Sequence, residues 1–196
     1  MLERAKRCPP DVELPKNGWP AYGCAVSPNR SFVLVAKWET VVRVDLATRK
    51  VTHTYKGFEG ASGVALTPDG LEAVVADYSG SRVGRIQLAT GRVDFPFGGD
   101  GEFKGAHSVA VADDGSFALV TNYGNDTVGW IDLLSNNNHK KGTRPKAYSG
   151  FKDPRGVAIS PDRSCALVSC QGDNTVRRLE LATGTVTAVF EGFKGP

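Results

Sequence analysis

Eight side chains in this 196-residue chain stand where a repeated pattern of short apolar segments would bring them to one end of the molecule. Four directly precede a first apolar segment: Tyr22, Ser62, His107 and Arg155. Four directly follow a second apolar segment: Lys37, Asp77, Asn122 and Cys170. If these segments are strands of consecutive sheets, the connections between them emerge at the same end. That end is the natural place for a small ligand or a partner to bind.

The residue types at these positions do not favour metal-dependent or nucleophilic catalysis. A metal site needs several imidazole or carboxylate ligands that face one point. This set holds one histidine and one aspartate, and the charge of Arg155 would repel a divalent cation. GxSxG, Walker-type, HExxH and paired-carboxylate motifs are absent from the sequence. We therefore expect no catalytic residue, no metal and no cofactor, and an enzyme is the less favoured reading.

A repeated segment organises the whole chain. It occurs at residues 23–29 (GCAVSPN), 63–69 (GVALTPD), 108–114 (SVAVADD) and 156–162 (GVAISPD). The second residues of successive copies are 40, 45 and 48 residues apart, close to the length of a four-stranded propeller blade. Each copy leads through a Pro/Asp-type turn to a second, almost wholly apolar strand. A third strand with alternating charges and a glycine-containing turn into a fourth strand complete the unit.

This pattern predicts an all-β fold with essentially no helix. We expect a β-propeller of four tandem, four-stranded antiparallel blades, at about residues 19–59, 60–104, 105–152 and 153–196, after an N-terminal extension of residues 1–18. Pro96 and Pro145 fall in predicted fourth strands. Because proline within a sheet is confined to edges and strand ends, these positions agree with a fourth strand at the outer rim.

The units resemble a known group of repeats. Residues 63–86 (GVALTPDGLEAVVADYSGSRVGRI) resemble NHL-type repeats, and residues 118–128 (ALVTNYGNDTV) are similar to the related YVTN-type repeat. The resemblance covers about residues 19–196 and implies a β-propeller, but the group includes scaffolds, partner-binding modules, lactonases and lyases. One function left open is a noncatalytic protein-interaction or structural module, as a subunit or segment of a larger assembly. The alternative is a lactonase-like hydrolase or lyase that acts on a small molecule at the central opening.

The end of the sequence predicts an unclosed ring. Residues 191–196 (EGFKGP) match residues 149–154 (SGFKDP), which lead into the fourth unit. We expect a protein partner or further blades to complete the ring, unless the first and fourth blades meet directly. The apolar rows that closure must cover are predicted at Val33, Val35, Val42 and Val44 on the first blade, and at Leu167, Leu179 and Val186 on the last.

Charge and hydropathy set weaker limits. The net charge is +3, and the basic residues gather in one inserted loop at Lys140, Lys141, Arg144 and Lys146. One function of such a loop is to contact phosphate or an acidic partner surface by charge. No aromatic residue interleaves the basic ones, so we expect a solvated hairpin and no nucleic-acid partner. The longest uninterrupted apolar run, residues 32–36, is far shorter than a membrane-spanning helix. No secretory signal is recognisable, which favours a soluble intracellular protein.

Four cysteines and two other positions give local expectations. Cys8, Cys24, Cys165 and Cys170 lack CxxC spacing and are too sparse for a disulfide framework, so we expect reduced thiols. Cys24 takes the place of a valine in the other copies and is predicted to be a small core residue. Cys165 and Cys170, five apart on one strand, should point to opposite faces. Arg49 stands at a turn position that is glycine elsewhere, which predicts a positive φ. Trp130 replaces an arginine found in the other units and should be covered, either by a partner or, as we prefer, by the neighbouring blade.

Overall fold

The computed structural model describes residues 20–97, 101–134 and 147–194, and this part of the chain is built almost entirely from β-strands. A single short 3-10 helix, η1 (Tyr123–Asn125), is the one helical element among these residues. The strands are β1 (Cys24–Val26), β2 (Phe32–Asp45), β3 (Val51–Leu66), β4 (Glu72–Asp77), β5 (Arg82–Gln87), β6 (Val93–Phe97), β7 (Ala106–Val111), β8 (Phe117–Asn122), β9 (Thr127–Asp132), β10 (Ala147–Tyr148), β11 (Pro154–Ile159), β12 (Cys165–Cys170), β13 (Thr175–Glu180) and β14 (Thr185–Phe190).

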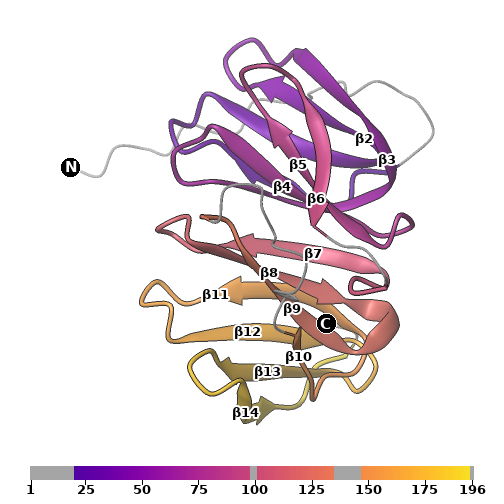
Figure 1. The fold of residues 1–196 in the computed structure, drawn as a ribbon, viewed down its shortest axis with the longest axis vertical. Coiled ribbons are helices and arrows are strands. Elements are labelled where there is room, and N and C mark those ends of the chain that lie inside the picture. The colour runs from indigo at the N-terminus through magenta and orange to yellow at the C-terminus, as the bar shows by residue number, and fades with distance from the viewer. Residues whose placement is uncertain (1–19, 98–100, 135–146, 195–196) are drawn as a thin grey trace.

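The strands form three antiparallel sheets that follow one another along the molecule. The first has six strands in the order β1 to β6, the second has the order β10-β9-β8-β7, and the third has the order β11-β12-β13-β14. The first and last sheets lie at opposite ends of the long axis (Figure 1). The all-β prediction is confirmed, but the four sheets of four strands predicted from the sequence are three sheets of six, four and four.

The six-stranded sheet contains two sequence repeats. The ends of β2 lie side by side, because the backbone N–H of Leu46 donates to the carbonyl of Ser31 (2.9 Å). The strand therefore folds back on itself near Trp38, whose φ is 57°, and includes both the second and the third predicted strand. β3 in turn pairs with β2 through residues 51–56 and Ala61, and with β4 through residues 61–66. The two repeats share one sheet because Ala61 of β3 pairs with Trp38 of β2 on one side and with Asp77 of β4 on the other.

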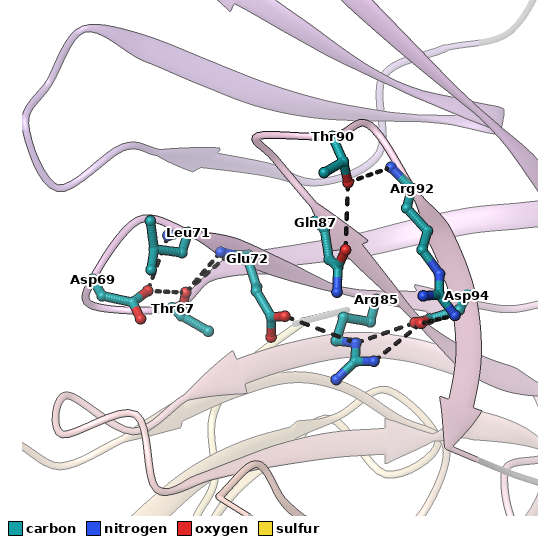
Figure 2. Close-up of polar contacts among 9 residues, drawn as sticks. All are labelled: Thr67, Asp69, Leu71, Glu72, Arg85, Gln87, Thr90, Arg92 and Asp94. Atoms are coloured by element: carbon teal, nitrogen blue, oxygen red, sulfur yellow. Dashed lines mark hydrogen bonds and ion pairs between the residues drawn. The ribbon is translucent and has the colours of Figure 1, made fainter. Parts of the chain in front are cut away.

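The turn between the first two strands has the same geometry in all four repeats. Its fourth residue has a positive φ of 57° to 72° and donates its backbone N–H to the carbonyl three residues earlier, at Arg30, Gly70, Gly115 and Arg163. Its third residue caps the turn through a side-chain oxygen, at Asn29, Asp69, Asp114 and Asp162. Figure 2 shows the second copy, in which Asp69 accepts from the Thr67 hydroxyl (2.6 Å) and the Leu71 N–H (2.9 Å). The predicted Pro/Asp-type turns are confirmed.

The core lies between consecutive repeats. One side of each repeat, here called its forward face, points at the following repeat and carries Leu34, Val74 or Leu119 on the second strand. The opposite side, its rear face, points at the preceding repeat and carries Ala73, Ala118 or Ala166. None of these six side chains is more than 1% exposed. At about 25 cal/mol per Å² of apolar surface removed from water, these contacts stabilise the packing of each repeat on the next.

The first strands of the repeats run next to one another. β1 contacts β3, β3 contacts β7, and β7 contacts β11. The first strands of successive repeats therefore lie side by side along the array. No helix in the described part of the chain has the length and apolar character needed to cross a membrane.

Candidate functional site

The four residues predicted to follow the second strands are buried rather than presented at the end of the array. Lys37 is 7% exposed, and Asp77, Asn122 and Cys170 are fully buried. Asp77, Asn122 and Cys170 are each the last residue of their strand, and Lys37 directly precedes the point at which β2 turns back at Trp38. The Asp77 carboxylate accepts from the N–H groups of Glu59 (3.0 Å) and Gly60 (2.6 Å) and from the Arg82 guanidinium (3.0 Å). It therefore holds the linker between the first two repeats.

Asn122 and Cys170 are engaged in the core in a similar way. The Asn122 amide donates to the Thr127 hydroxyl (3.1 Å) within the second sheet. Cys170 belongs to the hydrophobic cluster between the third and fourth repeats. Burial raises the pKa of the Cys170 thiol, so the thiolate needed for reactivity is disfavoured.

The four residues predicted to precede the first strands have different environments. The Ser62 hydroxyl is buried and bridges two repeats through the carbonyls of Ala106 (3.0 Å) and His107 (2.8 Å). Tyr22 is 47% exposed. His107 is half-buried, and its ring lies 3.2 Å from the Arg155 carbonyl. Burial, together with the nearby charge of Arg155, lowers the pKa of His107, so its imidazole is neutral at pH 7.

Three aromatic residues that the sequence analysis did not select lie at this end of the array. Trp38, Tyr78 and Tyr123 each come one residue after the predicted positions. With Tyr22 they form a continuous row, with ring centres 5.4 Å apart for Tyr22–Trp38 and 6.2 Å apart for both Trp38–Tyr78 and Tyr78–Tyr123. The Arg155 guanidinium ends the row, 4.2 Å from the centre of the Tyr123 ring. The signal that could have found the row is an aromatic residue at the same place in three repeats.

These contacts make the row a connection between repeats. Tyr78, from the second repeat, touches both His107 (6.2 Å, edge-on) and Tyr123 of the third. The described residues contain no group of three or more His, Cys, Asp or Glu side chains that could hold a metal ion. The predicted basic loop with Lys140, Lys141, Arg144 and Lys146 lies outside the described residues.

Equivalent residues of the repeats differ most in solvent exposure on the forward face of the last repeat. Leu167 is 44% exposed, whereas its counterparts Leu34, Val74 and Leu119 are at most 1% exposed. Phe190 is 46% exposed, and Phe193, just after the last strand, is 44% exposed. Together with the half-buried Ser169 and Val176 they make up the open face, as this surface is called below.

The prediction of apolar rows at the two ends was partly wrong. On the last repeat Leu167 is exposed as expected, but Leu179 and Val186 belong to the rear face and pack against the third repeat. On the first repeat the predicted row is covered: Val35, Val42 and Val44 are buried in a cluster of their own, with Val33 half-buried beside them. The two ends of the array therefore differ in kind.

The local expectations had mixed outcomes. Cys24 is exposed, so its prediction as a core residue was wrong. It lies on β1, the edge strand of the first sheet. In the described part of the chain no repeat precedes this one and covers it, whereas the second repeat covers the third. Cys165 and Cys170 do point to opposite faces, because Cys170 with Ala166 and Val168 lies in the rear-face cluster. Trp130 stacks on Phe117 (ring centres 3.8 Å apart) and packs against the same cluster, as predicted.

No family model matches the chain, and neither does any curated protein. Among solved structures, the fold is similar to that of Kuenenia stuttgartiensis hydrazine synthase, with a TM-score of 0.76 and 18% sequence identity. The match covers 92% of this chain and 51% of that one, so the chain spans about half the length of its structural neighbour. At this identity the likeness concerns the fold alone.

Proposed function

We propose that this chain is a noncatalytic β-propeller segment that serves as an interaction or structural module in a larger assembly, and that the open face is its binding surface. The carrying observation is the exposure of Leu167 at a position that is closed in every other repeat. Leaving several large apolar side chains wet forfeits roughly 1.5–3 kcal/mol for each of them. Contiguous exposed apolar surface of this kind is typical of a protein-binding site.

The partner is a β-sheet, because each of the three covered forward faces is closed by the sheet strands of the next repeat. NHL-like repeats in a propeller are a natural setting for this arrangement, in which successive sheets cover one another around an axis. The lactonase-like alternative gains no support from the site residues. Ser62 and Asp77 are committed to hydrogen bonds that join repeats, and Cys170 is buried as a thiol.

Photo-crosslinking of the natural protein tests this function. A photoreactive amino acid replaces Leu167 on the open face, and in a matched control it replaces Leu71, which is 62% exposed in a turn of the second repeat. We expect crosslinks from position 167 that map to strands of another sheet, and no comparable product from position 71. A protein that is monomeric by native mass spectrometry and gives no crosslink from position 167 would contradict the proposal.

A further inference from the structure

The open face has the same side-chain pattern as the three forward faces that are already covered. Each forward face has an aliphatic residue on the second strand and a valine at the start of the third. The valines are Val41, Val83, Val128 and Val176, and each pairs across the sheet with an aromatic residue: Tyr55, Phe97, Tyr148 and Phe190. A linker phenylalanine follows in every repeat: Phe58, Phe103, Phe151 and Phe193.

The burial of these groups depends only on whether a repeat follows. Tyr55, Phe97 and Tyr148 are 3–6% exposed, against 46% for Phe190. Phe58, Phe103 and Phe151 are 1–5% exposed, against 44% for Phe193. The open face therefore has the same kinds of side chain as the three covered forward faces, and it differs from them in that no repeat is packed against it.

The three rear faces show what such a cover must contain. On the second strand each has the pattern alanine, any residue, valine: Ala73 and Val75, Ala118 and Val120, Ala166 and Val168. On the third strand each has a large aliphatic residue: Ile86, Ile131 or Leu179. All nine side chains are at most 1% exposed. The small alanine lets the aliphatic residue of the facing strand approach closely.

The linker phenylalanine points to a second feature, which two of the three rear faces share. An added Cβ at Gly84 would lie 2.8 Å from the Phe58 ring, and one at Gly129 would lie 2.8 Å from the Phe103 ring. These glycines lie on the third strands of the second and third repeats, and the space left by their missing side chains is filled by the two rings. We call such a position a glycine seat. In the fourth repeat Arg177 stands at this place and instead donates to the Gly150 carbonyl.

The first repeat of a second copy lacks both of these features. Its rear face has Val33 where the others have alanine, and Val42 where two of them have glycine. Val35, Val42 and Val44 are moreover already buried. Head-to-tail association of two copies would need this covered face to open.

We propose that the open face receives one further four-stranded repeat with an Ala-x-Val second strand and room for the Phe193 ring beside its third strand. This inference rests on the proposed function and specifies its partner. Packing of the further repeat would bury Leu167, Phe190 and Phe193 as their counterparts are buried now. It would also cover Cys165, which lies half-buried on the open face of β12 next to the exposed Leu167.

An extended chain tests the fit directly. A copy of residues 62–97 is added after Pro196, because Gly192 to Pro196 has the same length as Gly57 to Ala61, which precedes that segment in the native chain. The added segment contains no cysteine and provides the Ala-x-Val strand and the glycine seat. We expect thiol modification of Cys165 to slow by about tenfold or more, as for a group that reacts only on local opening. Cys24, which is exposed, and Cys170, which is buried, serve as unchanged internal references.

Two matched variants of the extension separate docking from mere attachment. In the first, the added copies of Ala73 and Val75 on the rear face become glutamate; in the second, the added copies of Val74 and Ala76 on the forward face do. We expect only the first pair to restore the Cys165 rate of the unextended chain. An extension that leaves Cys165 unprotected, or two variants with equal effects, would overturn the inference. If position 167 crosslinks in the natural protein but the extension does not protect Cys165, the proposed function stands and this inference fails. If the extension protects Cys165 but position 167 gives no crosslink, the added repeat fits the open face and the proposed function is refuted.

Discussion

Phe151 and Phe193 follow the same local structure and end in opposite environments. Each comes after a glycine of positive φ, 95° at Gly150 and 94° at Gly192, and before a lysine. Phe151 is 4% exposed in the cluster between the third and fourth repeats, whereas Phe193 is 44% exposed. The linker thus has one geometry, and only the presence of a following sheet decides whether its aromatic ring is buried.

This pair predicts two very different costs of truncation. Phe151→Ala should lower the free energy of unfolding by about 3–5 kcal/mol, because it leaves a cavity between repeats. Phe193→Ala in the same chain should change it by no more than about 0.5 kcal/mol, as for an exposed position. Urea unfolding of the two variants measures both values. Similar losses at the two positions would mean that Phe193 is already seated against another part of the chain.

The glycine seats predict a steric effect. Gly84→Ala should destabilise the protein by about 1–3 kcal/mol, since the new methyl group meets the buried Phe58 ring and, at 3.0 Å, the Phe95 ring. Adding Phe58→Leu should recover part of this loss, which a double-mutant cycle reports as a coupling energy. Strict additivity of the two changes would show that the methyl group and the Phe58 ring do not meet.

Arg49 is predicted to be a strained turn residue, and its φ of 60° matches the 75° of Gly91 and the 74° of Gly184. All three donate their N–H to the carbonyl four residues earlier (2.8 Å). Arg49→Gly should therefore stabilise the protein by up to about 1 kcal/mol. The reverse change at an open position, Gly91→Arg, should destabilise it. Thermal unfolding of both variants tests the signs, and a less stable Arg49→Gly protein would contradict the turn geometry.

The turn aspartates predict a loss of stability in acid. Hydrogen bonds from the Thr67 hydroxyl and the Leu71 N–H lower the pKa of Asp69, and those from Ser160 and Ser164 lower the pKa of Asp162, below the ordinary value of 3.8. Their contribution is therefore present above about pH 3.8 and is lost as the pH falls through the lowered values. Replacing both with asparagine, the residue at position 29, keeps the acceptor oxygen but removes the titration. Urea midpoints at pH 7 and pH 3 should differ less for this variant than for the wild type; parallel losses would refute the assignment.

Much of the fold followed from the sequence because its repeats carry strong local signals. The turns at Asp69 and Asp162, the apolar second strands and the glycine-containing turns all have backbone requirements that single residues reveal. The division into sheets did not follow. Whether β2 reverses at Trp38 without a break, and whether β3 passes from one repeat into the next, depends on pairing across the chain.

The site was harder to predict because one residue of register reverses the direction of a side chain in a strand. Asp77 and Asn122 were selected as the polar residues after a strand, but they are its last buried residues, and Tyr78 and Tyr123 lie at the end of the array instead. The open face depends on long-range packing. Nothing local distinguishes Leu119 from Leu167, since only a neighbouring sheet sets their exposure.

The most direct test of the open face compares Cys165 in the isolated 196-residue chain and in the natural assembly. Cys165 is half-buried on the open face, and Cys170, on the opposite face of the same strand, is fully buried. In the isolated chain we predict that a small alkylating reagent modifies Cys165 much faster than Cys170. In the natural assembly the Cys165 rate should fall toward that of Cys170 while exposed Cys24 still reacts. Equal Cys165 rates in the two samples would show that no sheet covers the open face and would contradict the account.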